Sequence, residues 1–234
     1  PPFIDREDDH TAAYFHCTNR GKESIAIDFT DEADLAKLKT IIADADVLIE
    51  NFKVGGLKKF GLDYESLQAA NPKLVYCSVT GFGQDGPYAS RAGYDFLIQG
   101  MSGIMSLTGE PDGPPQKIGV AFADVFSGLY GVIGIQAALT ERNTSGLGQH
   151  IDISLLDCMT GVLANQAMNY LASGNTPKRL GNAHPNIAPY QTFATSDGDI
   201  IVACGNDRQF SALCGVLGLD HLGTDPKFAT NPER

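Results

Sequence analysis

Hydrophobic and polar positions along the first eighty residues follow two different periods. The segment 24–29, SIAIDF, alternates and is rich in β-branched residues, which predicts a strand. Residues 31–45 place their apolar side chains on one stripe, which predicts an amphipathic helix capped by Thr30. Short apolar runs at 46–51 and 73–80 predict two buried strands separated by a further helix. This alternation of strands and helices predicts a parallel sheet covered by helices.

The pattern beyond residue 80 predicts mostly helices. An apolar helix is expected at about 95–107, followed by a Gly/Pro-dense loop at 108–117 and then a long apolar helix. Residues 149–173 read as a strand that runs into another helix. Alternating residues around a Ser-Asp-Gly turn predict a hairpin at 191–206, and a helix is expected at 207–218.

These elements predict an α/β fold in two parts. We expect a Rossmann-like domain with a parallel sheet in residues 1–185, and the start of a smaller α+β domain in residues 186–234. Both ends of the chain have loop composition, so we expect the fold to be truncated at each end.

Composition narrows the function classes. With 234 residues, 43% hydrophobic and 19% charged, the chain reads as an ordinary soluble globular protein. Its net charge of −11 argues against a nucleic-acid surface, although a few local cations would suffice for a small anionic ligand. Five scattered cysteines without a CxxC pair indicate reduced thiols in the cytoplasm, while a mitochondrial location stays open. No His or Cys spacing suggests a metal site, and none is expected.

One carboxylate stands out within the long apolar segment. Asp124 is the single residue charged at neutral pH between Ile118 and Leu139, a stretch long enough to span a bilayer. A carboxylate at the centre of a membrane span would cost about 2.5–3.5 kcal/mol. We therefore predict a buried helix of a soluble protein and no membrane partner.

The helical pattern places Asp124 on a face of very small side chains. At roughly 100° per residue, the positions within about 60° of it are small residues, namely Ala121, Ser127, Gly128 and Gly131. Small neighbours allow close approach, either of another backbone or of a ligand. A helix cap or a buried, amide-bonded aspartate is the structural alternative. In the first two turns of the helix, the dipole would favour the ionised carboxylate.

Two other motifs are weak. Residues 81–86 match GxGxxG after a predicted strand, but Pro87 follows and no helix begins inside the motif, so a glycine-rich turn is favoured over a dinucleotide site. His184 lies beside Pro185 and has no second ligand at metal spacing. We interpret His184 as a loop residue, and a role in ligand contact stays open.

Several separated segments resemble the class III CoA-transferases. The resemblance runs through nearly the whole chain, whose relatives are longer at both ends. It rests on these stretches: VLIENFKVGGLKKFGLDYESLQAANPKLVYCSVTGFGQDGPYASRAGYDFLIQGMSG, TGEPDGPPQKIGVAFADVFSGLYGVIGIQAAL, GLGQHIDISLLD and GNAHPNIAPYQTF.

The resemblance implies that Asp124 is a catalytic nucleophile. In this family the matching aspartate attacks an acyl-CoA thioester and passes through an aspartyl anhydride and an aspartyl-CoA thioester before CoA reaches a free acid, succinyl-CoA being one candidate donor. Covalent catalysis suits this exchange because it divides a difficult acyl transfer into easier steps. Glycine-rich loops can supply backbone N–H donors for the oxyanions.

The resemblance also implies the CoA contacts and the assembly. Coenzyme A would act as a thioester substrate, with no permanently bound cofactor, and members of the family form interlocked homodimers. Asn51, Phe52, Lys53 and Lys59 match CoA-contacting positions of the family. The adenosine diphosphate part of CoA would lie near these residues and near Ile27, Asp28, Phe29 and Thr30, and Arg91 and Tyr94 would border the pantetheine channel.

The α-methylacyl-CoA racemases, which are similar in fold, are the main alternative. They need a second acid–base group, a histidine, where this chain has Tyr94. Because an unperturbed tyrosine with a pKa near 10 is a poor base at neutral pH, the residue favours acyl exchange. The glycine run of formyl-CoA transferases is also missing, since the chain has only LGNAHPN there. We therefore expect acids larger than formate or oxalate, such as succinate.

Overall fold

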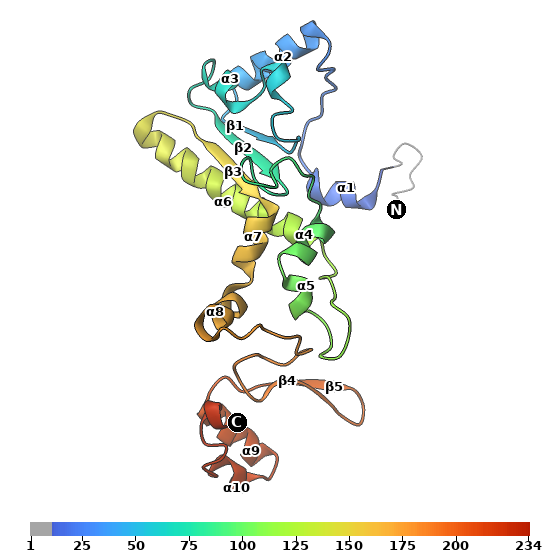
Figure 1. Ribbon diagram of the computed structural model, residues 1–234, viewed down its shortest axis with the longest axis vertical. Helices are drawn as coiled ribbons and strands as arrows, with labels where there is room; N and C mark the ends of the chain where they lie inside the picture. Colours follow the sequence, from blue (N-terminus) through green and yellow to red (C-terminus); the bar gives the residue numbers. More distant parts are fainter. Residues whose placement is uncertain (1–10) are drawn as a thin grey trace. The chain divides into compact units, whose positions relative to one another are not determined.

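The computed structural model describes residues 11–234 (Figure 1). The chain divides into two compact units, one ending at Ala45 and the other running from Asp46 to Arg234. The boundary near residue 185 that the sequence suggested stays a prediction.

The described part of the first unit contains two helices, α1 (Ala13–Thr18) and α2 (Glu32–Ala43). The predicted helix is confirmed, but its cap is Asp31 and not Thr30, since the Asp31 carboxylate accepts hydrogen bonds from the backbone N–H groups of Ala33 and Asp34. The predicted strand at 24–29 is wrong. A strand needs a neighbour to take its backbone hydrogen bonds, and no segment within residues 11–234 pairs with this stretch.

A parallel three-stranded sheet organises the second unit. It consists of β1 (Val47–Glu50), β2 (Val75–Thr80) and β3 (His150–Ser154), with β2 in the centre. Val47 pairs with Val75, and Tyr76 pairs with His150. The expected α/β fold with a parallel sheet is confirmed.

Helices connect these parallel strands. The expected helix at 95–107 is two helices, because Gly103 adopts a left-handed φ of 91° between them. The predicted helix after β3 is likewise divided, at Leu163. The elements between the strands are η1 (Lys58–Phe60), α3 (Tyr64–Gln68), α4 (Asp95–Met101), α5 (Ile104–Leu107) and α6 (Phe122–Ser145). After β3 follow α7 (Leu155–Val162) and α8 (Ala164–Ser173).

The 24-residue helix α6 packs along one face of the sheet (Figure 1). Alternate residues of β2, Val75 and Cys77, face α6 and meet Ile135 and Ala138 in one buried cluster. At its end, the Arg142 guanidinium donates to the Lys73 carbonyl at 2.9 Å and to the Asp46 carboxylate at 2.8 Å. The helix is therefore fixed to the sheet along its middle and at its C-terminal end.

The opposite face of β2 carries polar and aromatic side chains. The Tyr76 hydroxyl donates to the Leu62 carbonyl at 2.9 Å, and the Ser78 hydroxyl lies 2.9 Å from the His150 ring nitrogen. The Tyr64 ring, from α3, stacks on the His150 ring with centroids 5.1 Å apart. Because both faces are covered, the central strand is almost wholly buried.

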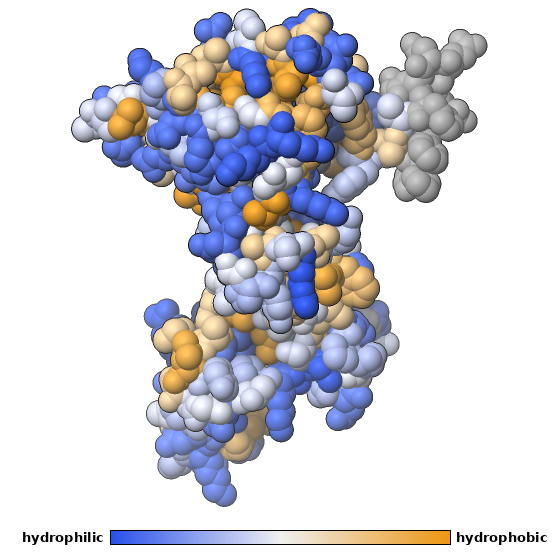
Figure 2. Space-filling model, turned by 45° about the horizontal axis from the view of Figure 1, so that its top comes forward, coloured by the Kyte–Doolittle hydropathy of each residue, from blue (hydrophilic) through white to orange (hydrophobic). Residues whose placement is uncertain are grey.

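The predicted burial of α6 is only partly right. Its sheet-facing side is buried, but Leu129, Val132 and Ile133 on the other side are more than half exposed. Apolar side chains also reach the surface among polar ones in the space-filling view (Figure 2). By length and composition alone, α6 could cross a membrane, although a core helix of a soluble protein meets the same criterion.

The C-terminal part begins with the predicted hairpin. Strands β4 (Tyr190–Ala194) and β5 (Asp199–Ala203) pair antiparallel, and α9 (Asp207–Val216), α10 (Asp220–Gly223) and η2 (Asn231–Glu233) follow. The helix α9 confirms the predicted helix at 207–218 apart from its last two residues.

The five cysteines are free thiols, as expected. Cys17 is exposed, and the other four are buried.

Candidate functional site

A pocket of about 510 Å³ lies at the carboxyl ends of the parallel strands. In open α/β sheets this edge is where ligands bind. The chain reaches the pocket directly after β1, at the end of β2 and directly after β3, and α4 and α6 contribute their first turns. The lining residues are Asn51, Phe52, Lys53, Val54, Val79, Thr80, Gly81, Ala89, Ser90, Arg91, Ala92, Gly93, Tyr94, Asp95, Asp124, Ser127, Gly128 and Leu155.

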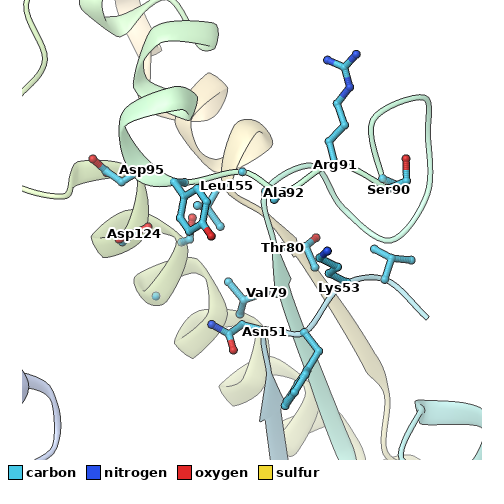
Figure 3. A pocket seen from close by; sticks show the side chains of 18 residues that line it. Asn51, Lys53, Val79, Thr80, Ser90, Arg91, Ala92, Asp95, Asp124 and Leu155 are labelled. Carbon is cyan, nitrogen blue, oxygen red and sulfur yellow. The ribbon is translucent and has the colours of Figure 1, made fainter. Parts of the chain in front are cut away.

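Asp124 lies on the wall of this pocket, in the first turn of α6 (Figure 3). The predicted small-residue face is confirmed, because Ser127 and Gly128 line the same pocket one turn later. An alanine Cβ at Gly128 would meet no atom within 4 Å, so the space beside Asp124 is open. No hydrogen bond to the Asp124 carboxylate occurs within the described residues. Within residues 11–234, Asp124 is therefore a pocket-lining carboxylate and not an amide-bonded one, and its catalytic role stays a prediction.

Partial burial raises the pKa of the Asp124 carboxyl, and the negative charge of Asp95 raises it further. The helix N-terminus that the sequence placed beside Asp124 acts in the opposite direction. A raised pKa destabilises the ionised form, so a carboxylate at this position is a stronger base than an ordinary one.

Asp95 is a pocket residue that was not predicted from the sequence. It is the first residue of α4, and its carboxylate accepts a hydrogen bond from the backbone N–H of Ala123 at 2.8 Å. Figure 3 shows Asp95 and Asp124 on the same side of the pocket, on neighbouring helix starts. In the sequence, Asp95 directly follows Tyr94 and precedes an apolar helix, which could have marked it as a site residue. An aspartate at the start of a helix is usually only a cap, however.

Two glycines bring the loop after β2 against the pocket. An alanine Cβ at Gly81 would lie 2.5 Å from the Cα of Gly93, so only two glycines let these backbones touch. The loop is held by the Thr80 hydroxyl, which accepts from Gly83 N–H at 3.0 Å, and by the Asp152 carboxylate, which accepts from Gln84 N–H at 2.8 Å. No helix begins within residues 81–86, which confirms the glycine-rich turn.

Two cations and a tyrosine also line the pocket. Lys53 lies across it from Asp124, while the Arg91 side chain extends away from Asp124 (Figure 3). The Arg91 guanidinium stacks on the Tyr88 ring at 4.3 Å from its centroid. Tyr94 is 76% exposed at the N-cap of α4. These side chains could hold an anionic group at the pocket mouth.

The structure brings most of the predicted site residues together. Those that line the pocket with Asp124 are Asn51, Phe52, Lys53, Arg91 and Tyr94. Lys59 does not line it, because its ammonium group lies over the Phe60 ring at 4.6 Å.

Four predicted CoA contacts belong to the other compact unit, where they form the turn before α2. These residues are Ile27, Asp28, Phe29 and Thr30. The Asp28 carboxylate accepts hydrogen bonds from the Thr30 hydroxyl and backbone N–H, which lower the pKa of Asp28. Their role and that of Lys59 in binding CoA stay predictions.

His184 has a local partner. Its ring nitrogen Nδ1 accepts a hydrogen bond from the Asn186 backbone N–H at 3.0 Å, and its ring packs 5.1 Å from that of Tyr190. These contacts support the interpretation as a loop residue.

The fold and the pocket agree with the comparison to known proteins. The chain matches CoA-transferase family III over residues 2–234, and it belongs to that family. The resemblance read from the sequence motifs is thereby confirmed.

Two curated relatives illustrate the similarity. A protein of Agrobacterium fabrum named succinate–glutarate CoA-transferase is 58% identical over 100% of this chain and 59% of its own length. A protein of Acetobacter aceti named acetyl-CoA:oxalate CoA-transferase is 44% identical over 94% of this chain and 57% of its own length. The chain thus spans somewhat more than half of these relatives.

A solved structure is also similar. The crystal structure of a CAIB/BAIF family protein from Brucella suis is 66% identical, with a TM-score of 0.85, and the match covers 100% of this chain and 62% of that one. This similarity confirms the α/β fold.

Proposed function

We propose that the whole protein transfers CoA from an acyl-CoA to a free carboxylic acid, with Asp124 as the covalent nucleophile. The observation that carries this proposal is the Asp124 carboxylate, which lines an open pocket and has no hydrogen-bond partner within the described residues. Family membership supports CoA as the transferred group.

The first half of the reaction takes place on Asp124. A carboxylate oxygen attacks the thioester carbonyl, the C–S bond breaks, and the donor's acyl group becomes an anhydride with Asp124 while CoA leaves as a thiolate. The thiolate then attacks the Asp124 carbonyl of that anhydride. This step forms an aspartyl-CoA thioester and releases the donor acid as its carboxylate.

The second half reverses these steps with the acceptor. The acceptor carboxylate attacks the aspartyl thioester, which expels CoA thiolate and forms a second anhydride. The thiolate attacks the acceptor's carbonyl, so that acyl-CoA leaves and the Asp124 carboxylate is restored. Each attack creates an oxyanion, and the backbone N–H groups of the glycine-containing pocket walls are candidate donors for it.

The charges of the pocket support acidic substrates. Lys53 and Arg91 line it, and cations of this kind can bind the phosphates of CoA or the distal carboxylate of a dicarboxylic acid. We propose succinyl-CoA as the first donor to test, since the relative from Agrobacterium is named for succinate and glutarate. Oxalate belongs in the same panel because of the relative from Acetobacter.

The test is mass spectrometry of the full-length protein after incubation with succinyl-CoA. We expect a CoA-sized or succinyl-sized adduct on the peptide that contains Asp124, and none in Asp124→Asn. Asp157→Asn is the matched control, because Asp157 is also an aspartate in a first helical turn but lies outside the pocket.

Absence of the adduct with a range of acyl-CoAs would refute transfer. Uptake of solvent deuterium at the α-carbon of a branched acyl-CoA, without an acid acceptor, would instead identify a racemase.

We also propose that the whole protein is a homodimer, interlocked as its family resemblance implies. The exposed apolar side of α6, formed by Leu129, Val132 and Ile133, supports this assembly because such a continuous apolar strip is expected to be covered. Light scattering of the full-length protein should give twice the mass of one chain. Ile133→Glu should weaken the dimer, whereas a monomeric wild-type protein would refute the proposal.

A further inference from the structure

The side-chain amide of Gln99 is wholly buried in α4, with 0% exposure. Its oxygen Oε1 accepts a hydrogen bond from the backbone N–H of Ile118 at 2.8 Å. Its nitrogen Nε2 donates to the Asp95 carboxylate at 2.8 Å and, over a longer 3.4 Å, to the Val120 carbonyl. A buried amide is retained only when it is hydrogen-bonded in this way. Two of its three partners belong to the segment that leads into α6.

The start of α6 has no cap of its own. The N-cap position is Ala121, whose side chain cannot accept a hydrogen bond, and the first backbone N–H groups of a helix need partners from elsewhere. Asp95 supplies one, because its second carboxylate oxygen accepts from the Ala123 N–H at 2.8 Å. The side chains of α4 therefore hold the chain at three points between residues 118 and 123, directly before Asp124.

We propose that Gln99 is a positioning residue for Asp124, acting through Asp95 and through the backbone of residues 118–120. This proposal rests on the proposed function, in which Asp124 must meet a thioester carbon at a defined distance and angle. A displacement of about 1 Å in such a site can cost on the order of 100-fold in rate. Because Gln99 does not line the pocket, it acts without touching the substrate.

Replacing the Gln99 amide by a carboxylate tests its hydrogen bond to Asp95, because the charged groups around it respond differently to the two protonation states. Asp95 faces it from the same helix, Asp124 follows on α6, and the Lys117 ammonium lies 3.3 Å from the Ile118 carbonyl. An ionised carboxylate in place of the amide would keep the acceptor for Ile118 N–H but would repel Asp95. A protonated one would again donate a hydrogen bond to Asp95.

The experiment measures single-turnover formation of the Asp124 adduct in the full-length protein with succinyl-CoA. Gln99→Met, which keeps the side-chain length but removes the polar atoms, should slow adduct formation by roughly 10–100-fold. The equilibrium affinity for free CoA should stay within about twofold of wild type, because no CoA-contacting group is changed. Met159→Leu is the matched control, since Met159 is equally buried in the core cluster beside Ala123 but bonds to neither Asp95 nor residues 118–120.

Gln99→Glu adds a readout that loss of stability would not produce. Its rate of adduct formation should approach that of wild type at low pH and fall behind as pH rises and the introduced carboxyl ionises. Because Glu is nearly the same size as Gln, this variant tests whether Gln99 positions Asp124 even if Gln99→Met does not fold.

The outcomes separate the two proposals. No adduct in the wild-type protein overturns the proposed function. An adduct in wild type that forms equally fast in Gln99→Met, or a rate loss that Met159→Leu matches at equal melting temperature, overturns only the role of Gln99. The role of Gln99 is also overturned if the ratio of the adduct-formation rates of wild type and Gln99→Glu does not change with pH.

Discussion

Helix α6 contains three glycines whose surroundings differ, so the effect of Gly→Ala on stability can be compared among them. Gly128 borders the pocket, Gly131 faces β2 and β3, and Gly134 lies against Ile151. Glycine inside a helix is less favourable than alanine by about 0.5–1 kcal/mol, because it loses more backbone freedom on folding. Each Gly→Ala change therefore raises the unfolding free energy by the same backbone contribution. Differences among the three variants come from the contacts of the added methyl group.

The structure gives a different packing contribution at each position. At Gly128 the new methyl group meets nothing within 4 Å, so we expect the full gain of about 0.5–1 kcal/mol. At Gly131 its nearest neighbours are 3.9 Å away, which adds ordinary contacts without strain. At Gly134 the Cβ would lie 3.1 Å from Ile151 Cγ2, and overpacking of a core costs about 1–3 kcal/mol, which outweighs the gain.

The assay is urea unfolding of the full-length protein and its three variants. Gly128→Ala and Gly131→Ala should raise the unfolding free energy, and Gly134→Ala should lower it. Gly128→Ala should also slow adduct formation on Asp124, because its methyl group occupies space in the pocket. A Gly128→Ala protein that is less stable than wild type would show that this side of α6 is not open, and the reasoning would fail.

Three further predictions concern charge and burial. Arg142→Met should lower the unfolding free energy by about 1–3 kcal/mol, nearly all from the lost bond to a backbone carbonyl because the partner carboxylate is 78% exposed. Thiol labelling of the folded protein at pH 8, read by peptide mass spectrometry, should modify Cys17 and spare Cys77, since burial raises the pKa of Cys77 to about 11. Adduct formation should fall with decreasing pH at a midpoint above the ordinary aspartate pKa of about 3.9, because the pKa of Asp124 is raised. Asp95→Asn should move that midpoint to lower pH, and an unchanged midpoint would contradict the role of its charge.

The sheet and the nucleophile candidate were predictable from the sequence because each has a local signal. The strands at 46–51 and 73–80 are short apolar runs between helical patterns, and both find neighbours in the parallel sheet. Asp124 was conspicuous as a lone carboxylate in an apolar helix. The segment 24–29 carries an equally good strand pattern, yet pairing is a tertiary property that no pattern within one segment contains.

The supporting residues of the site could not be predicted in this way. Asp95 and Gln99 lie one helical turn apart in an apolar helix and look like capping or surface residues. Their role depends on the backbone of residues 118–123, which is more than twenty positions away from Asp95. Only the packing of α4 on α6 brings these groups together.

The placement of Asp124 and Val125 side by side on α6 has a consequence for the whole protein. Val125 is 48% exposed and belongs to the same uncovered apolar side as Leu129. A partner that covered that side would end one residue from Asp124, the proposed nucleophile, and would border the pocket there. Subunit association, if it occurs there, would thus help to shape the acyl-binding space, and dilution below the dissociation constant should weaken substrate binding before it unfolds either chain.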